Sequence, residues 1–429
     1  MIEHQTLPNG VRIVTEPVPG MRSAALGIWV GTGSRHERAQ ENGAAHFIEH
    51  MVFKGTDRRT AAELAQEMDA IGGQVNAFTT KECTCFHARV LDRQLPRAAD
   101  LLCDMVFHSR FDEGDVATER GVILEEIGMY EDNPEDLCAE RLTMAAFGES
   151  ALARPILGSA ETLGAMTGES LRTYMAQHYR PQDIVVALAG SFTPADVAEL
   201  ERRFGALPAG PSPAMEGAAY RPAVTVKYKP IEQNHLTLAF PGLTYGDGRR
   251  YQMQLLSAML GAGMSSRLWQ EVREKRGLCY SVYSYAVGHA DTGLFGVYTA
   301  VNPEAEEEAM EAICRVIADF AGHSPGEEEL RRAREQAKAN VLMGQESTQN
   351  RMSALGRGEL LHRHVYPLEE VLAGYDAVTT AQVRALAEEL FDFRRASLSA
   401  VGRVGEAGGY AERLGRMGAQ PVGSGRRVL

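Results

Sequence analysis

The chain has 429 residues, 44% hydrophobic and 24% charged, a composition typical of soluble proteins with sizeable hydrophobic cores. Its length corresponds to roughly two to four domains. The formal net charge of -13 makes the chain a poor ligand for a nucleic-acid backbone and favours neutral or basic partners. No apolar run approaches the roughly 18 residues that a membrane span requires. We therefore expect no nucleic acid and no membrane among its partners.

The start of the chain and its cysteines indicate a cellular compartment. In MIEHQTLPNGVRIV an early glutamate precedes an alternating strand pattern, so we expect no signal peptide. The six cysteines, at positions 83, 85, 103, 138, 279 and 314, lack the CxxC spacing of many metal sites. On a strand Cys83 and Cys85 face the same way, which favours packing over metal binding. These features predict a reduced, cytoplasmic protein.

Strand patterns open each half of the chain, and helical patterns follow them. The first half starts with NGVRIVTEPV and SAALGIWVGTGS and continues with the helical TAAELAQEMDAIG. The second half starts with VTVKYK and HLTLAFPG and later contains the helical GEEELRRAREQAKANVLMGQES. Strands and helices mixed within each half predict an α+β fold, with a mostly antiparallel sheet in each half that helices cover on one side.

Residues 43–56, GAAHFIEHMVFKGT, form an apolar, helix-compatible run that contains two histidines and a glutamate. His46 and His50 are four residues apart, so on a helix both imidazoles lie on one face and can bind one ion. Glu49 lies close to the same face. This HxxEH pattern reverses the HExxH arrangement, in which two histidines bind zinc and a glutamate acts as base. Unpaired polar groups in an apolar helix are costly, which favours a metal site over a plain helix surface.

A catalytic zinc normally has three protein ligands, so a further ligand must come from elsewhere in the chain. The stretch ERGVILEE places Glu119 and Glu126 almost two helical turns apart and therefore on one face, whereas Glu125 points away. One carboxylate of the pair would bind the metal, and the other would orient a ligand or the polar network around it. The alternative is that both glutamates belong to a solvated helix face.

A gapless internal repeat relates residues 166–192 to residues 378–404, with a constant offset of 212. In both copies a threonine, Thr167 or Thr379, precedes a helical stretch, and a strand pattern that ends in glycine follows. An offset of this length exceeds any solenoid repeat and predicts two homologous domains.

A stretch rich in proline, glycine, alanine and serine separates the two copies and lacks periodicity. We therefore predict one domain at residues 1–207, a linker at 208–223 and a second domain at 224–429.

Three segments carry a resemblance to a known family: GAAHFIEHMVFKGT, GGQVNAFTTKE at 72–82 and ERGVILEEIGMYEDNP at 119–134. Together they resemble the inverzincin metallopeptidases, and more closely the pitrilysin and mitochondrial processing peptidase family in its short two-domain, bacterial branch. The resemblance covers essentially the whole chain. It implies that the two domains form half of a clamshell.

The resemblance also assigns roles to the residues of the first half. It implies one Zn²⁺ per chain, held by His46, His50 and Glu126. Glu49 would be the general base, and Glu119 the supporting acid behind the ligands.

Residues 261–286 resemble the family segment that carries an arginine and a tyrosine seven residues apart, here Arg273 and Tyr280. Trp269 lies one turn before the arginine and is a further candidate for substrate binding. The resemblance implies that Arg273 and Tyr280 bind the scissile region of a peptide and stabilise the tetrahedral intermediate, and both side chains are suitable donors for a developing oxyanion. The alternative is a surface arginine and a half-buried strand tyrosine.

The second half itself lacks zinc ligands. The region that corresponds to the zinc helix, 250–264, contains no histidine or glutamate. At the offset of the repeat, Arg331 and Lys338 stand in place of the two carboxylates. We therefore expect the first domain to be catalytic and the second to be a structural and substrate-binding partner.

These features predict a zinc-dependent endopeptidase that hydrolyses extended oligopeptides or unfolded segments. Glu49 would take a proton from the attacking water and pass it to the leaving amine. The alternating GGQVNAFTTKECTCFHARV is a predicted edge strand to which a peptide adds by backbone pairing, with Asn76 and Ala77 nearest the site.

In the family that the chain resembles, the domain with the arginine and tyrosine completes a zinc site from the opposite half of the clamshell. In short chains that half is a second subunit. Because this chain carries both parts, we predict a homodimer that encloses peptides in a chamber, each site completed by Arg273 and Tyr280 of the neighbour. The alternatives are a non-catalytic structural subunit of a larger complex, which zinc content would distinguish, and a specialised peptide-maturation peptidase.

Overall fold

The computed structural model describes residues 1–212 and 214–418, which form two compact units. Each unit includes a segment from the other half of the sequence. Unit 1 comprises Met1–Gly128, Arg154–Glu216 and Leu342–Val365. Unit 2 comprises Met129–Ala153, Gly217–Val341 and the described residues from Tyr366 onward. The domain boundaries predicted at residues 207 and 224 separate the two homologous halves of the sequence, which differ from these units. They stay a prediction.

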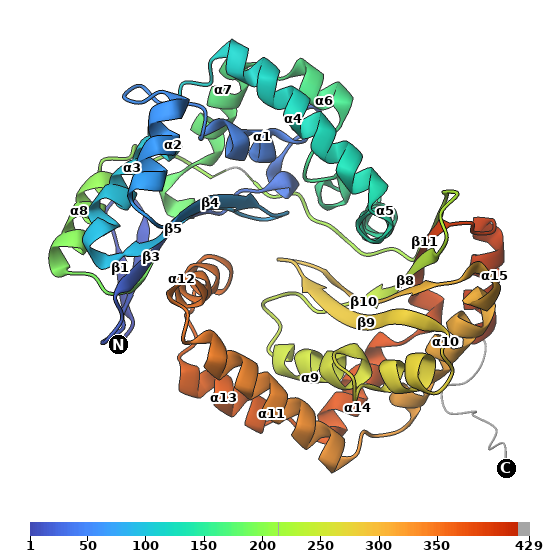
Figure 1. Cartoon of the computed structure of the whole chain (residues 1–429). Helices are drawn as coiled ribbons and strands as arrows, with labels where there is room; N and C mark the ends of the chain where they lie inside the picture. Colours follow the sequence, from blue (N-terminus) through green and yellow to red (C-terminus); the bar gives the residue numbers. More distant parts are fainter. Residues whose placement is uncertain (213, 419–429) are drawn as a thin grey trace. The chain divides into compact units, whose positions relative to one another are not determined.

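Unit 1 contains a six-stranded sheet in the order β1-β2-β6-β3-β5-β4 (Figure 1). β2 and β6 pair in parallel, and the other neighbouring strands pair antiparallel. The strands are β1 (Glu3–Thr6), β2 (Arg12–Pro17), β3 (Ser23–Val30), β4 (Gln74–Thr79), β5 (Thr84–Leu91) and β6 (Ile184–Gly190). The helices are α1 (Ala44–Met51), α2 (Ala61–Ala70), α3 (Leu95–His108), α4 (Glu113–Asp132), α6 (Ala160–Ala165), α7 (Gly168–His178), α8 (Pro194–Gly205) and α12 (Thr348–Arg357); the last residues of α4 belong to unit 2.

Unit 2 contains a five-stranded sheet in the order β7-β11-β8-β10-β9. β7 and β11 pair in parallel, and the other neighbours pair antiparallel. The strands are β7 (Val224–Tyr228), β8 (Asn234–Pro241), β9 (Cys279–Gly288), β10 (Gly293–Val301) and β11 (Ser397–Gly402). The helices are α5 (Pro134–Phe147), α9 (Arg250–Gly261), α10 (Glu306–Gly322), α11 (Glu327–Gly344), α13 (Leu368–Asp376), α14 (Thr380–Leu390) and α15 (Ala407–Gly418); the last residues of α11 belong to unit 1.

The two sheets share one strand order. The order β2-β6-β3-β5-β4 of unit 1 matches β7-β11-β8-β10-β9 of unit 2, and β1 is additional. The repeated helices α7 and α14 also begin alike, because the hydroxyls of Thr167 and Thr379 each accept a hydrogen bond from a backbone N–H of the first turn. The prediction of two homologous α+β domains, each built on a mostly antiparallel sheet, is confirmed.

Glycine ends the equivalent strands β6 and β11 for a steric reason. Gly190 and Gly402 have φ angles of 115° and 138°, which favour glycine. A Cβ atom at Gly190 would lie 2.3 Å from the carbonyl oxygen of Ser23, and one at Gly402 would lie 2.4 Å from Oδ1 of Asn234. The glycine that closes each copy of the sequence repeat is therefore required by the backbone.

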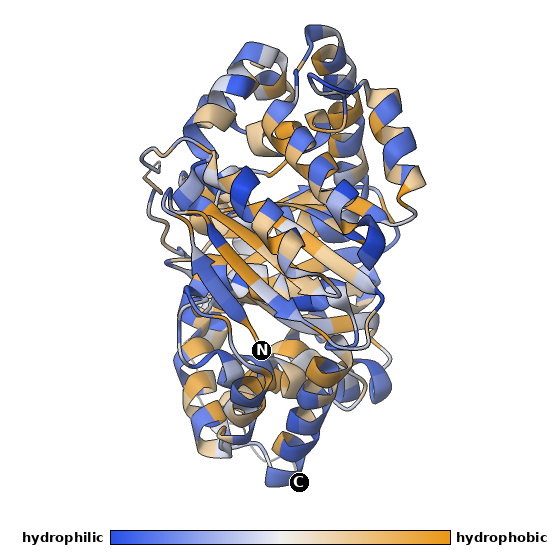
Figure 2. Cartoon of the chain, turned by 90° about the vertical axis from the view of Figure 1, so that its left-hand side faces the viewer, coloured by the Kyte–Doolittle hydropathy of each residue, from blue (hydrophilic) through white to orange (hydrophobic). Residues whose placement is uncertain are grey.

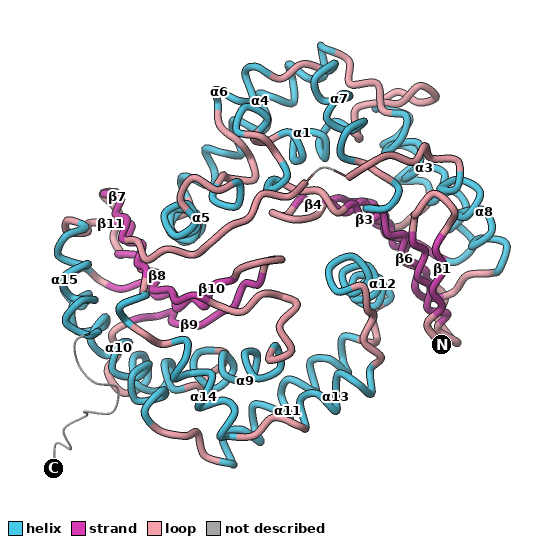
Figure 3. The backbone as a smooth tube through the Cα atoms, turned by 180° about the vertical axis from the view of Figure 1, so that it is seen from behind, coloured by secondary structure: helices cyan, strands magenta, loops and turns pink. Residues whose placement is uncertain are grey.

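Helices cover both faces of the unit 1 sheet, so the prediction of helices on one side is wrong. α1 and α3 lie on one face, and α12 packs against β2, β3 and β6 on the other (Figures 1 and 3). Met352 of α12 is buried in an apolar cluster with Trp29, whose indole N–H lies 3.4 Å from the methionine sulfur. β3 and β6 are buried along almost their whole length, as strands covered on both faces are.

The unit 2 sheet is covered in the same way. α9, α10 and α14 contribute to the main core on one face. α5 packs against β7, β8 and β11, where Leu137 and Cys138 contact Val401. Figure 2 shows helices whose hydrophobic residues gather along one side, the pattern of helices that lie on a sheet.

The state of the cysteines and the character of the helices can be compared with the expected reduced compartment and the expected lack of a membrane span. All six cysteines are buried free thiols. Cys83 and Cys85 lie in the apolar cluster around Trp29, as their predicted packing role requires. None of the described helices combines the length and the apolar character needed to cross a membrane.

His178, at the end of α7, makes the stability of unit 1 depend on pH. Its buried ring stacks on Tyr174 with the ring centroids 4.0 Å apart, and its Nδ1 has no hydrogen-bond partner among the described residues. Burial lowers the pKa of His178 from 6.5 to about 4. Between these values the unfolded chain binds a proton that the folded chain does not bind. The free energy of unfolding therefore falls as the pH drops from 6.5 towards 4.

We predict that His178→Phe removes part of this acid sensitivity while keeping a stacked ring. For the wild type, His178 accounts for a loss of about 2 kcal/mol in the free energy of unfolding between pH 7 and pH 5. Urea denaturation of both proteins at the two pH values measures this difference. Equal losses in wild type and variant would show that His178 titrates normally.

Candidate metal centre

The helix that carries the HxxEH pattern is short and buried. α1 spans eight residues and packs against β4 and α7. Phe47 and Ile48 belong to the core of unit 1. The rings of His46 and His50 lie next to each other, with centroids 4.7 Å apart, as their helical spacing predicts.

Glu126 lies on α4, and its carboxylate faces both imidazoles. Its Oε2 atom is 3.6 Å from His46 Nε2 and 3.5 Å from His50 Nε2. One ligand atom from each of the three residues lies within 4.8 Å of the others. A tetrahedral zinc with bonds of about 2.0–2.1 Å holds its ligand atoms roughly 3.3 Å apart. The three side chains therefore converge as zinc ligands do.

The protonation state of His46 and the contacts of Glu126 are also compatible with metal binding. Burial, with a smaller contribution from the His50 charge, lowers the pKa of His46 to about 4, so this imidazole is neutral at neutral pH. Metal binding requires neutral imidazoles. Among the described residues, no lysine or arginine forms an ion pair with Glu126. Two imidazoles and one carboxylate are the donor set of catalytic zinc sites that keep one position open.

Glu119 lies behind His50 and is held by a lysine that the sequence analysis missed. The buried carboxylate of Glu119 places Oε2 3.1 Å from His50 Nδ1 and Oε1 2.6 Å from Lys54 Nζ. A hydrogen bond from Nδ1 to a carboxylate fixes the ring so that Nε2 points to Glu126. Lys54 lies beyond the end of α1 at Met51, so helical spacing from His50 does not reveal this contact.

Glu49 lies beside the cluster, and one of its carboxylate oxygens has no hydrogen-bond partner within the described part of the chain. Its Oε2 atom is buried and accepts no hydrogen bond from the described residues. Burial raises the pKa of Glu49, and the Glu126 charge adds to this effect. A carboxyl group with a raised pKa is suited to exchange protons near neutral pH. Glu125 is exposed, in keeping with its predicted direction.

Trp269, Arg273 and Tyr280 come together in unit 2. Trp269 and Arg273 lie in a π-helical segment, Trp269–Glu274, and Tyr280 lies at the start of the edge strand β9. The guanidinium carbon of Arg273 is 3.9 Å from the centroid of the Trp269 ring and 5.2 Å from that of the Tyr280 ring. Tyr280 is 78% exposed. The three residues therefore form a cation–π stack at the surface of unit 2.

Asn76 and Ala77 lie on β4, the edge strand of the unit 1 sheet, which contacts α1. Asn76 is exposed and Ala77 is buried. A cavity of about 560 Å³ adjoins this edge, and Phe53 and Met68 line it together with Asn76. The predicted edge strand therefore exists as β4, whereas the second part of the predicted stretch forms β5 inside the sheet.

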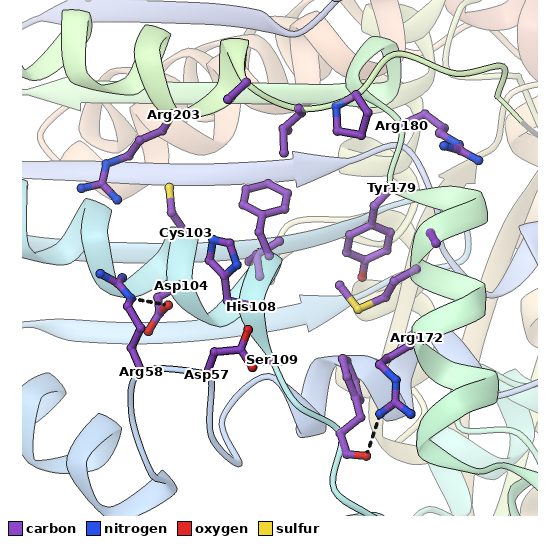
Figure 4. Close-up of a pocket in the computed structure, with 18 of the residues that line it drawn as sticks. Asp57, Arg58, Cys103, Asp104, His108, Ser109, Arg172, Tyr179, Arg180 and Arg203 are labelled. Carbon is purple, nitrogen blue, oxygen red and sulfur yellow. Dashed lines mark hydrogen bonds and ion pairs between the residues drawn. The ribbon is translucent and has the colours of Figure 1, made fainter.

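A further cavity in unit 1, of about 850 Å³, lies between α3, α7 and α8 (Figure 4). None of the predicted site residues lines it. Two of the charged side chains on its wall have partners of their own. Arg58 Nε lies 2.8 Å from Asp104 Oδ1, and Arg172 donates to the carbonyl oxygen of Phe111 at 3.2 Å.

The described residues of unit 2 include no counterpart of the metal cluster. Arg331 and Lys338, which replace the two glutamates, lie on α11 and pair with Glu328 and Asp376 at 2.7 and 3.0 Å. In the described part of the chain, His46, His50 and Glu126 are the only group of three histidine, cysteine, aspartate or glutamate side chains that converges in this way.

A two-domain α+β fold with one inverted HxxEH cluster defines a class of metallopeptidase scaffold in which one half carries the metal site. Family models agree with this class. The model described as insulinase (peptidase family M16) matches residues 12–160, and the model described as peptidase M16 inactive domain matches residues 165–337. The chain belongs to the M16 peptidase family, in its short two-domain branch.

Relatives cover almost the whole chain. It is 42% identical to the uncharacterized zinc protease YmxG of Bacillus subtilis over 94% of this chain and 100% of the relative. It is 43% identical to an uncharacterized zinc protease of Streptomyces coelicolor over 94% of this chain and 89% of that protein. Two solved structures share the fold. A peptidase M16 inactive domain from Pseudomonas fluorescens has a TM-score of 0.88 and 22% identity, over 94% of this chain and 98% of that one. A protease from Helicobacter pylori has a TM-score of 0.86 and 21% identity, over 94% of this chain and 99% of that one.

We predict that Glu126→Gln weakens zinc binding and that Glu125→Gln, its exposed neighbour, does not. The amide cannot supply a charged ligand, and it leaves two imidazoles as donors. Zinc content after gel filtration, with a chelator competition for the dissociation constant, measures the effect, which we expect to exceed 100-fold. Full zinc content in the Glu126 variant would mean that another carboxylate is the third ligand.

Proposed function

We propose that this chain is a zinc-dependent endopeptidase that hydrolyses extended oligopeptides or unfolded segments. The observation that carries the proposal is the convergence of His46, His50 and Glu126, with the unpartnered carboxylate oxygen of Glu49 beside them. The relatives that bear the name zinc protease support it. One zinc ion per chain follows from the one converging cluster in the described residues.

In this proposal His46, His50 and Glu126 would hold a zinc ion, which would supply an activated water molecule and polarise the peptide carbonyl. Glu49 acts as general base, because its buried oxygen is free to accept a proton. Its raised pKa lets it hold that proton and return it to the leaving amine. Glu119, held by Lys54, orients the ring of His50 and does not touch the substrate.

The substrate lies extended along the edge of the unit 1 sheet. β4 has an unpaired edge next to α1, so a peptide strand can add to it by backbone hydrogen bonds near Asn76 and Ala77. The cavity beside this edge takes a side chain of the bound peptide, and its wall includes Phe53 and Met68. Strand addition requires a segment without its own secondary structure, which favours oligopeptides and unfolded regions over folded proteins.

The active assembly in this proposal is a cytoplasmic homodimer whose chains enclose a chamber, each chain forming half of a clamshell. Arg273 and Tyr280 of one chain bind the scissile region held at the metal centre of its partner. The support for this arrangement is that both side chains lie together at the surface of unit 2, and that each chain carries both the ligand set and this pair.

We predict that wild type cleaves an internally quenched peptide in a zinc-dependent manner and that Glu49→Gln loses about 10²- to 10⁴-fold in kcat while keeping its zinc. The amide cannot accept the proton, but it leaves the three ligands intact. Glu63→Gln, at the exposed start of α2, is the control and keeps full activity. A wild type that contains no zinc and cleaves no peptide, even after zinc is supplied, would favour a structural subunit over an enzyme.

We further predict complementation between two inactive chains. Mixed dimers of Glu49→Gln and Arg273→Ala contain one site with both wild-type parts, so mixing restores up to about a quarter of the wild-type rate when chains exchange freely. Each variant alone is the control. No recovery after verified subunit exchange would contradict the completion of a site by the neighbour.

A further inference from the structure

The zinc helix α1 has no side-chain cap of its own. Its N-cap residue is Gly43, with φ of 99°, and no side chain at that position can accept the backbone N–H groups of the first turn. A Cβ atom at Gly43 would also lie 2.8 Å from the carbonyl oxygen of Leu157. The chain therefore has to satisfy the first turn of α1 from elsewhere.

The carboxylate of Glu37 performs this task from outside the helix. Its Oε2 accepts the backbone N–H of Gly43 at 2.8 Å, and its Oε1 accepts the backbone N–H of Ala45 at 2.8 Å. Oε2 also accepts the side-chain amide of Asn42 at 2.9 Å. Glu37 is only 2% exposed, so these charge-assisted hydrogen bonds form away from water.

The residue that Glu37 holds is directly next to a metal ligand. Ala45 precedes His46, and His46 lies within the first turn of a helix of only eight residues. Helices fray most easily at their ends. A negative charge near the N-terminus stabilises the helix, because it interacts favourably with the positive end of the helix dipole. A displaced first turn would move His46 away from His50 and Glu126, whose positions depend on other contacts.

Contacts with residues 154 and 155 fix the segment that carries Glu37. Arg154 donates a hydrogen bond to the backbone carbonyl oxygen of Glu37, and Asn42 also donates to the carbonyl oxygen of Pro155 at 2.8 Å. Burial raises the pKa of Glu37 to about 7, while its hydrogen bonds from Ala45, Asn42 and Gly43 favour the ionised form. All three of those partners are donors, so the ionised carboxylate is the form that satisfies them.

We infer that Glu37 is a positioning residue of the metal centre, which acts through the backbone of α1 to hold His46 in place for zinc. This inference rests on the proposed function, because it concerns the same ion. It assigns to Glu37 an effect on zinc binding in addition to any effect on the stability of the fold. The two effects can be measured separately.

The test compares Glu37→Gln with a matched control, Glu306→Gln, at pH 8, where the Glu37 carboxyl is ionised. Glu306 is also buried, at 9% exposure, and accepts hydrogen bonds from Asn234 and Tyr410 at 2.6 Å in unit 2. Both substitutions remove a buried charge without changing side-chain volume. In Glu37→Gln the new amide N–H faces a donor, whichever way the amide is turned.

We expect Glu37→Gln to raise the dissociation constant for zinc, measured by chelator competition, by about 10- to 100-fold, the usual effect of losing a group that orients a metal ligand. The visible spectrum of the cobalt-substituted variant should shift, because the geometry at the ion changes. Glu306→Gln should lower the melting temperature of the metal-free protein and leave the zinc constant within twofold of wild type.

Glu37→Asp keeps the charge but is too short to reach both N–H groups, so we expect a smaller rise in the same constant; this variant decides the matter if Glu37→Gln does not fold. Zinc constants like that of wild type in the Glu37 variants, or an equal loss in Glu306→Gln, would overturn the inference. A wild type that binds no zinc would instead contradict the proposed function, before any variant is considered.

Discussion

The metal centre depends on one constraint: two imidazoles on α1 and one carboxylate on α4 must meet within the few tenths of an ångström that metal–ligand bonds tolerate. His50 and Glu126 are separated by 76 residues, so chain connectivity does not bring them together. Apolar packing of α1 into the core of unit 1 does so, with Phe47 and Ile48 directed inward. The buried carboxylate of Glu37 then fixes the start of the helix, and that of Glu119 fixes the ring of His50. A buried polar cluster of this kind costs free energy unless an ion or hydrogen bonds compensate it.

Comparing the two units shows which features belong to the shared fold and which belong to the metal site of unit 1 alone. Both sheets have the same order, the same parallel pair and the same glycine at the end of the equivalent strand. On α11 of unit 2, however, cations stand where α4 carries the two glutamates, and they form ordinary ion pairs at 2.7 and 3.0 Å. One scaffold therefore supports a metal cluster in one copy and a solvated ionic surface in the other. The chemistry resides in a few side chains and the fold does not dictate it.

Helical periodicity explains why the ligand set and Glu119 could be predicted, whereas Lys54 and Glu37 could not. Residues four or seven apart share a helix face in any tertiary context, so His46, His50, Glu119 and Glu126 were identified from spacing together with the family resemblance. Glu37 lies in an irregular loop and acts on backbone N–H groups, for which no spacing rule exists. Packing on the second face of each sheet was missed for a related reason, because α12 and α5 are distant in sequence from the strands that they cover.

The sequence by itself determined the α+β class and the duplication, and together with the family resemblance it identified the residues whose ligand atoms converge. Local rules produce these features: capping by Thr167 and Thr379, alternation in strands, and the 3.6-residue period of helices. Only the tertiary structure decided that α5 and α12 each join the unit whose sheet comes from the other half of the sequence, and that Lys54 and Glu37 support the zinc ligands. The choice of the apolar surface that α5 or α12 covers is made between segments far apart in the sequence, and the contacts of Lys54 and Glu37 are polar ones that form only in the folded chain. The patterns within a single segment carry no information about that choice.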